Sequence, residues 1–171
     1  MQEPFHQPGG AESPRRIEDL PVAERLLLRA FRRWVAGLSR NDGQQWAFVA
    51  TDFREHFDPD QARDAMAALA ALVRATWAAA RRPIACHPPC CAYVAADETL
   101  LVEFIGACQA GHWLLANTLA GLLLGAEGGG DLLRAAASLA RTLEARGLLL
   151  SPPAEGSLGG RRRPEAPAVW H

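Results

Sequence analysis

The sequence Arg-Pro-Ile-Ala-Cys-His-Pro-Pro-Cys-Cys, residues 82–91, separates two stretches of the chain that both have helical character. It contains three of the four cysteines and three of the twelve prolines. Proline lacks a backbone N–H and restricts its own torsion and that of the residue before it, so this stretch predicts a loop between helices. Because thiols and an imidazole are concentrated here, it is also the main candidate for a functional site.

Before this loop, apolar residues that recur every three or four positions predict three helices. The first covers residues 21–38 and the second, a short one, covers 43–57. The third begins with the capping sequence Asp58-Pro59-Asp60-Gln61, in which Asp58 is the N-cap and Gln61 is placed to reach back. Its apolar stripe is expected to extend to Trp77, and Pro83 is expected to end it.

After the loop, the same periodicity predicts two or three further helices. Asp97 and Glu98 are expected as the cap and exposed first turn of the fourth, and Glu103 as another exposed residue on it. Gly111 favours a break or kink before a segment that ends at Gly125. In the last helix, Asp131 is expected as the cap and Gly147 as a left-handed terminator.

The chain of 171 residues, 49% of them hydrophobic, is sufficient for one domain with a core of ordinary size. The expected fold is an all-α, single compact domain of five or six helices. Residues 1–19 are expected to form a mobile N-terminal arm, 20–150 the helical domain, and 151–171 a disordered C-terminal tail.

Charge and hydropathy restrict the location and the partners. The formal net charge of −1 argues against a surface that binds nucleic acid or an anionic membrane as a whole. The longest apolar run has twelve residues, 113–124, whereas a membrane-spanning helix needs about 20, so no membrane span is expected. No secretory signal is visible at the start, which makes a cytoplasmic location the default.

The cysteine-rich loop has the spacing of half a metal site. Cys86 and Cys90 are separated by three residues, which zinc sites commonly use, and a second pair four residues apart could complete the set. The candidate ligands for zinc or an iron–sulfur cluster are Cys86, His87, Cys90, Cys91, Cys108 and His112. The alternative is structural, with Cys108 packed in the core and His112 at a cap or on the surface.

A thiol-redox or redox-sensing protein is the second hypothesis. Exchange between Cys86 and either Cys90 or Cys91 is the more plausible chemistry, since a disulfide between neighbours needs a strained ring. The Cys-x-x-Cys redox motif in a βαβ context is absent. No phosphate-binding loop, nucleophile elbow or metalloprotease motif is present, so no enzyme class is identified.

A third hypothesis is nucleic-acid binding through the first helix. Four arginines are expected on its polar face, where they could bind phosphate groups: Arg25, Arg29, Arg32 and Arg33. A solvated helix face explains the same pattern without a ligand.

The sequence Pro83-Ile-x-x-x-x-Pro-Cys-Cys is followed by Asp97-Glu98-x-Leu-Leu and preceded by Arg25-Leu-Leu-Leu-Arg-Ala-Phe-Arg-Arg-Trp. With these elements, residues 20–148 resemble a group of small uncharacterised bacterial helical proteins. The resemblance implies a helical fold and a recurring Pro-Cys-Cys element, but no activity, substrate or cofactor. The first hypothesis is a binding or regulatory helical protein without catalytic activity, with a protein partner or a second copy of itself as its target and with the loop 83–96 as a candidate zinc or iron–sulfur site.

Overall fold

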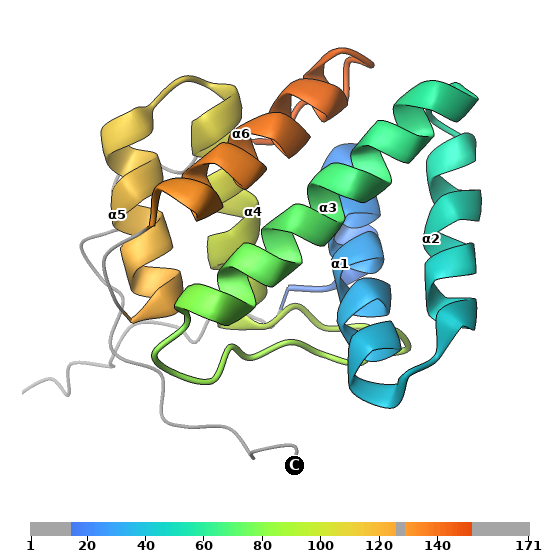
Figure 1. Ribbon diagram of the computed structural model, residues 1–171, viewed down its shortest axis with the longest axis horizontal. Helices are drawn as coiled ribbons and strands as arrows, with labels where there is room; N and C mark the ends of the chain where they lie inside the picture. Colours follow the sequence, from blue (N-terminus) through green and yellow to red (C-terminus); the bar gives the residue numbers. More distant parts are fainter. Residues whose placement is uncertain (1–14, 126–128, 152–171) are drawn as a thin grey trace, which may run out of the picture.

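The structure is a computed structural model that describes residues 15–125 and 129–151 (Figure 1). These residues form one short 3-10 helix, η1, and six α-helices. Their bounds are η1 Ile17–Asp19, α1 Val22–Arg40, α2 Gly43–Arg54, α3 Pro59–Ala79, α4 Ala96–Gln109, α5 Trp113–Leu124 and α6 Gly130–Glu144. The prediction of an all-α domain is confirmed; most of the expected arm and tail lies outside the described residues.

The long helix α3 runs diagonally across the face of the molecule in Figure 1. It packs against α6 on one side and against α2 and α1 on the other. Helix α4 packs against α5 and α6, and α1 packs against α2. The buried apolar residues of all six α-helices form one continuous core, so the chain folds as a single hydrophobic unit.

The start of α3 confirms the capping prediction only in part. The Asp58 carboxylate accepts a hydrogen bond from the Gln61 backbone N–H at 2.9 Å. The Gln61 side-chain oxygen, however, is buried without a partner among the described atoms, so the reciprocal half of the capping box is missing. The expected inner stripe is also too long at its end, because Trp77 is 64% exposed.

Two helix boundaries lie at the expected glycines, whereas the start of the last helix differs from its prediction. Gly111 has φ of +72° and separates α4 from α5, which confirms the predicted break. Gly125 has φ of +69° and is the C-cap of α5. The last helix differs from its prediction, because Gly129 and not Asp131 is the N-cap of α6.

Residues 15–19, which the sequence places in the mobile arm, are held against the rest of the domain. The Ile17 N–H donates to the Ala92 carbonyl at 2.8 Å, and the Val94 N–H donates to the Arg15 carbonyl at 2.9 Å. Ile17 is buried in the core. Among the described helices, none combines the length and the hydropathy that crossing a membrane requires.

Candidate functional site

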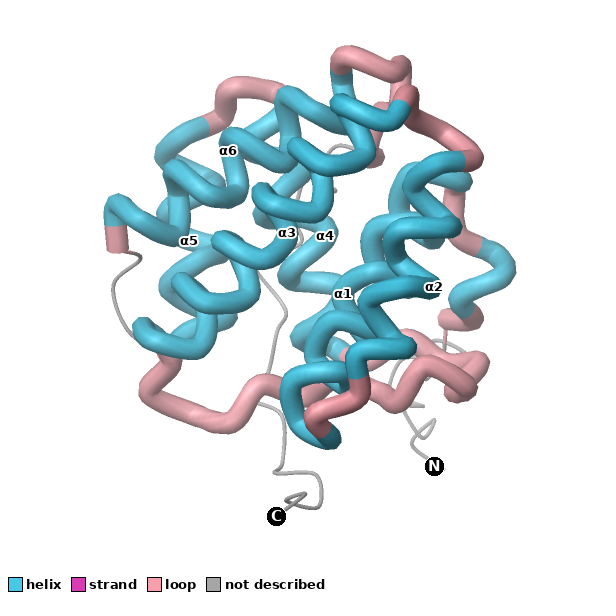
Figure 2. Tube along the Cα trace, turned by 45° about the vertical axis from the view of Figure 1, so that its right-hand side comes forward, coloured by secondary structure: helices cyan, strands magenta, loops and turns pink. Residues whose placement is uncertain are grey.

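The cysteine-rich loop, residues 80–95, joins α3 to α4 along the lower edge of the molecule in Figures 1 and 2. The outgoing segment, residues 80–87, and the returning segment, residues 92–95, are joined by a turn at residues 88–91. In this turn the Cys91 N–H donates to the Pro88 carbonyl at 3.0 Å. The returning segment forms an isolated antiparallel bridge from Tyr93 to Arg16. The loop thus has a defined path without regular secondary structure.

A buried ion pair between α1 and α4 lies against this loop. The Arg32 Nε is 2.7 Å from Glu98 Oε1, and its Nη2 is 2.7 Å from Glu98 Oε2. Each of the two residues is only 1% exposed. Burial alone would lower the pKa of Arg32, but the hydrogen bond and the charge of Glu98 outweigh it, so the pKa is raised. Arg32 therefore keeps its positive charge at neutral pH.

The same pair fixes the backbone of the loop. Arg32 also donates to the Cys91 carbonyl at 2.7 Å and to the Tyr93 carbonyl at 2.6 Å. Glu98 accepts from the His87 N–H at 3.1 Å and from the Ala95 N–H at 2.8 Å. One buried ion pair thus ties the outgoing segment to the returning segment; we call it the Arg32–Glu98 clamp.

A second ion pair holds the start of the loop. Arg82 forms a bidentate pair with Asp97, with N–O distances of 2.7 and 2.8 Å, and donates to the Leu122 carbonyl at 3.0 Å. Asp97 also accepts from the Ala85 N–H at 2.7 Å. The hydrogen bonds that Arg82 donates to Asp97 raise the pKa of Arg82. Asp97 and Glu98 lie in the first turn of α4 as predicted, but the rest of that prediction is wrong, because both residues are buried and Ala95, not Asp97, is the N-cap.

The four thiols have different surroundings. Cys86 is half-buried and desolvation raises its pKa to about 12. Cys108 is buried on α4, where desolvation raises its pKa to about 11. Cys90 is exposed at the turn, and Cys91 is half-buried beside it. Cys86 and Cys108 are consequently protonated at neutral pH and unsuited to act as thiolates.

The candidate metal ligands are not gathered at one point. No group of three or more His, Cys, Asp or Glu side chains within residues 15–125 and 129–151 is placed to hold a metal ion. Cys108 faces the core, whereas His112 is exposed at the N-cap position of α5. His87 lies in the outgoing segment of the loop, where its N–H contacts Glu98. Metal binding by Cys86, Cys90 and Cys91 stays a sequence-based prediction.

The four arginines of α1 that were predicted to bind anions do not share an exposed face. Arg32 is buried in the clamp, so the prediction fails for this residue. Arg25 donates to the Glu18 and Leu20 carbonyls, and Arg33 lies 3.7 Å from Asp52 and stacks on the Phe48 ring. Arg29 is exposed. Of the four predicted arginines, Arg29 is therefore the one that is exposed and takes part in none of these contacts.

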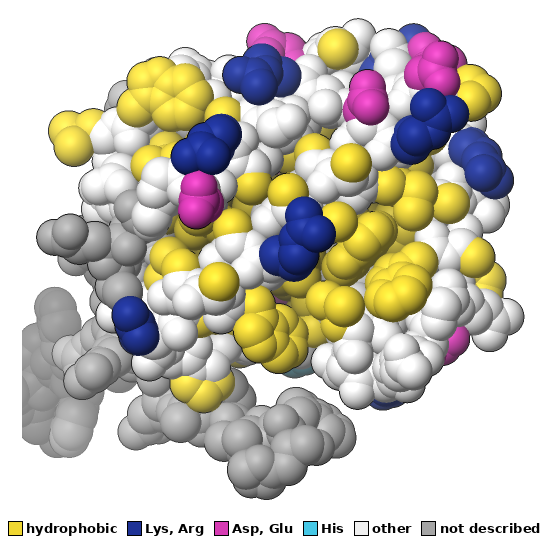
Figure 3. Space-filling view, in the orientation of Figure 1, with side chains coloured by type: hydrophobic (Ala, Val, Ile, Leu, Met, Phe, Trp, Pro, Cys, Tyr) yellow, Lys and Arg dark blue, Asp and Glu magenta, His cyan; other side chains and the backbone are white. Residues whose placement is uncertain are grey.

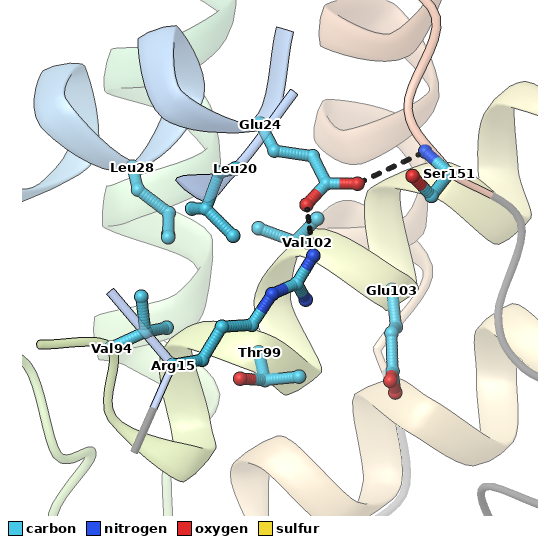
Figure 4. Close-up of a pocket in the computed structure, with 9 residues that line it drawn as sticks. All are labelled: Arg15, Leu20, Glu24, Leu28, Val94, Thr99, Val102, Glu103 and Ser151. Atoms are coloured by element: carbon cyan, nitrogen blue, oxygen red, sulfur yellow. Dashed lines mark hydrogen bonds and ion pairs between the residues drawn. The ribbon is translucent and has the colours of Figure 1, made fainter. Parts of the chain in front are cut away.

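A cavity of about 220 Å³ lies beside the returning segment of the loop (Figure 4). Its buried acidic residue is Glu24, which pairs with Arg15 at 3.2 Å and accepts from the Ser151 N–H at 3.2 Å. Figure 4 shows Glu103 extending away from Glu24. The cavity thus carries an ion pair that holds residues from both ends of the described chain onto α1.

Fold and site together define an all-α domain in which a cysteine-rich loop is fixed by buried ion pairs. No protein-family model, no curated protein and no solved structure matches the chain. The resemblance expected from the Pro-Cys-Cys element stays a prediction.

Sequence reasoning missed Arg32 as a structural residue, although a signal was present. Residues 26–28 are three consecutive leucines, so α1 is covered on more than one face, and Leu28 lies one helical turn before Arg32 on the same side. This signal indicates that position 32 is covered, but it does not identify the acidic residue that pairs with Arg32.

Proposed function

We propose that this protein acts by binding another protein, without catalysing a reaction, and that the loop of residues 80–95 and the adjoining end of α3 form the contact surface. The observation that carries this proposal is the Arg32–Glu98 clamp. It fixes the loop backbone from the inside, while Cys90 and Tyr93 keep their side chains exposed.

A loop that is already ordered loses less conformational entropy on binding, so its contacts contribute more to affinity. Replacing a buried ion pair by apolar residues is often neutral or stabilising, so such a pair is poorly explained as a source of stability. Its better-attested use is to specify one conformation. A preformed contact surface requires that the loop keep one conformation, which this ion pair specifies.

The side chains exposed along this surface are of the types that dominate binding energies. Trp77 is 64% exposed three residues before the loop begins, and Arg81 and Tyr93 are exposed within it. Tryptophan, tyrosine and arginine are the residues most enriched among interface hot spots. Figure 3 shows hydrophobic side chains gathered over the face formed by α3 and its neighbours. Trp77 is the anchor residue of the proposed surface.

The acidic residues of the site support binding over acid–base catalysis. Both oxygens of Glu98 accept hydrogen bonds from Arg32 and from backbone N–H groups. Both oxygens of Asp97 are likewise bonded to Arg82, and one of them also to the Ala85 N–H. A general base must reach a substrate proton, and these carboxylates are already occupied.

The test is a comparison of three full-length chains with an affinity tag: wild type, Trp77→Ala with Tyr93→Ala, and the control Leu149→Ala. Leu149 is 62% exposed, so its truncation also removes exposed apolar surface. A partner captured from a lysate of the source cells is purified and titrated by calorimetry. We expect at least a tenfold loss of affinity for the double variant and none for the control. Equal affinities for all three chains would refute the proposed surface.

A thiol-redox role is a second candidate, favoured by the exposure of Cys90 next to Cys91 in a tight turn. Mild oxidation with glutathione disulfide, followed by mass spectrometry, should attach glutathione at Cys90, and reductant should remove it. Cys86 should stay unmodified in the folded protein, because its pKa of about 12 keeps it a thiol. Absence of modification at Cys90 would exclude this role. Elemental analysis of the same sample for zinc, iron and sulfide tests the separate prediction of a metal site in the loop.

A further inference from the structure

The contact surface proposed above, which consists of the loop 80–95 and the adjoining end of α3, contains no acidic residue. Residues 65–96 include no aspartate and no glutamate, although the chain has 19 acidic residues and a formal net charge of −1. The same stretch contains Arg74, Arg81 and Arg82. This part of a nearly neutral protein therefore carries positive charge.

The two acidic residues that follow this stretch do not offset its charge at the surface. Asp97 is buried and pairs with Arg82, and Glu98 is buried and pairs with Arg32. Each of these carboxylates is thus balanced by one arginine inside the domain. The charges of the remaining arginines of the stretch are left at the surface.

These remaining arginines are Arg74 and Arg81. Both are exposed, and neither side chain forms a hydrogen bond or an ion pair with the part of the chain that the structure describes. Other exposed arginines differ in this respect, because Arg63 and Arg134 each pair with an aspartate three positions earlier on the same helix. The guanidinium groups at the proposed surface are therefore available to a partner.

The exposed ring of Trp77 lies next to this charge. Arg74 and Trp77 are three positions apart within α3, so they are neighbours on the helix surface. Arg81 follows the C-cap residue Ala80, where the loop begins. In Figure 3, hydrophobic side chains over the middle of α3 lie around a basic side chain that has no acidic side chain beside it. Aromatic residues and arginine are the types that protein interfaces enrich.

We propose that the partner of this surface is an acidic segment of a protein, in which carboxylates accompany at least one large apolar side chain. The apolar side chain packs on Trp77, and the carboxylates pair with Arg74 and Arg81, whose planar guanidinium groups match a carboxylate in two parallel hydrogen bonds. The inference rests on the proposed function, because it gives the chemistry of the partner for the same surface.

A nucleic acid fits this surface less well than an acidic protein segment. Its affinity depends on how many phosphates are neutralised, and strong binding uses about 6–10 phosphate contacts. An anionic membrane similarly attracts clusters of about four to eight cations. The surface has two unpaired arginines, and the chain contains no lysine. Two ion pairs around one apolar contact are sufficient for a short protein segment.

Selection from a phage-displayed library of short random peptides, with the full-length wild-type chain as the target, tests this chemistry without a known partner. We expect the enriched peptides to have an excess of aspartate and glutamate together with a large apolar residue. Enrichment of neutral or basic peptides, or of no peptide, would overturn the proposal.

The enriched peptides are then synthesised, and their affinities and association rates are measured by surface plasmon resonance. The variant Arg74→Gln with Arg81→Gln should lose about tenfold in affinity, mainly through slower association. The matched control is Arg63→Gln with Arg134→Gln, which removes the same net charge at arginines that already have partners. It should bind like the wild type, and an equal loss in both variants would contradict the assignment.

Charge reversal gives a result that a loss of folding cannot imitate. The variant Arg74→Glu with Arg81→Glu should reject the acidic peptides and bind versions in which lysine replaces each acidic residue. If this variant still prefers the acidic peptides, the two arginines do not select the partner and the proposal fails.

The failure of this inference can be distinguished from the failure of the proposed function. Peptides that bind Trp77→Ala with Tyr93→Ala weakly, but bind Arg74→Gln with Arg81→Gln like the wild type, would keep the surface and refute its acidic partner. Peptides that bind both variants like the wild type would refute the surface itself. A single-stranded oligothymidylate that binds more tightly than every acidic peptide at the same salt concentration would replace the proposed partner by a nucleic acid.

Discussion

Replacing Glu98 by alanine should destabilise the domain far more than removing an ion pair on the surface. The substitution leaves the guanidinium of Arg32 buried without its counter-charge, and the His87 and Ala95 N–H groups lose their acceptor. Breaking a buried pair by removing one partner costs about 3–5 kcal/mol. For a domain of this size, that corresponds to a fall in the melting temperature of roughly 6–20 °C.

A double-mutant cycle separates the interaction from the effects of each residue. The variant with both Arg32→Leu and Glu98→Leu removes both charges, so it should lose less than the sum of the two single leucine variants. The expected coupling energy between the two positions is about 2 kcal/mol. The matched control is Arg63→Leu, because Arg63 pairs with Asp60 while both side chains are largely exposed. It should cost less than about 1 kcal/mol.

Chemical denaturation, followed by tryptophan fluorescence and circular dichroism, gives the free energy of unfolding of each variant. Hydrogen exchange at the His87 and Ala95 amides gives the local effect, which should be a loss of protection in the milder variant Glu98→Gln. A cost for Glu98→Ala no larger than that of the exposed control, or a coupling energy near zero, would show that the pair does not hold the loop.

Three further predictions follow from single positions. In Gly37→Ala the added Cβ would lie 2.6 Å from the Trp46 Nε1, so denaturant titrations should show a free energy of unfolding lower by about 1–3 kcal/mol. The control Gly43→Ala has no atom within 4 Å of the new Cβ and should lose none of this free energy. Burial raises the pKa of Cys108 from 9.0 to about 11, so its stabilising contribution is complete below pH 9 and is lost as the pH rises to 11. The decline in unfolding free energy across that interval should be less steep in Cys108→Ala, by about 1.4 kcal/mol per pH unit, and equal slopes would contradict the assignment. Gly111→Ala should lower thermal stability by about 1 kcal/mol through its φ of +72° alone, since the new Cβ meets open space, and an unchanged melting temperature would argue against the left-handed turn.

The helices were predictable because their signals are local. The Asp58 cap, the break at Gly111 and the apolar spacing within each helix involve residues fewer than five positions apart. The inner face of α4, which includes Phe104 and Cys108, is buried as the periodicity predicts. Trp77 is the informative exception: Thr76 beside it is buried and Ala79 and Ala80 pack against the core, so the buried stripe continues past Trp77 while its own side chain faces outward.

The clamp could not be predicted in the same way, because its partners are 66 residues apart. An arginine on a helix and a glutamate in a helical first turn each have a sufficient local explanation, as a solvated residue and as a favourable charge near the N-terminus. Only the packing of the loop across α1 makes the two residues meet. The thiols of the loop show the same limit, since their short spacing predicts ligands, whereas no group of three or more His, Cys, Asp or Glu side chains in the described part of the chain is placed to hold a metal ion.

The first turn of α4 explains why two adjacent acidic residues serve one loop. Successive residues of a helix point about 100° apart, so Asp97 and Glu98 face different neighbours. Glu98 binds Arg32 of α1, and Asp97 binds Arg82 just after α3. The loop is therefore fixed only when α1, α3 and α4 are all in place, and its order is a property of the assembled domain. Glu98→Gln, which loosens this order while leaving Trp77 and Tyr93 in the chain, should weaken partner binding through ordering entropy alone.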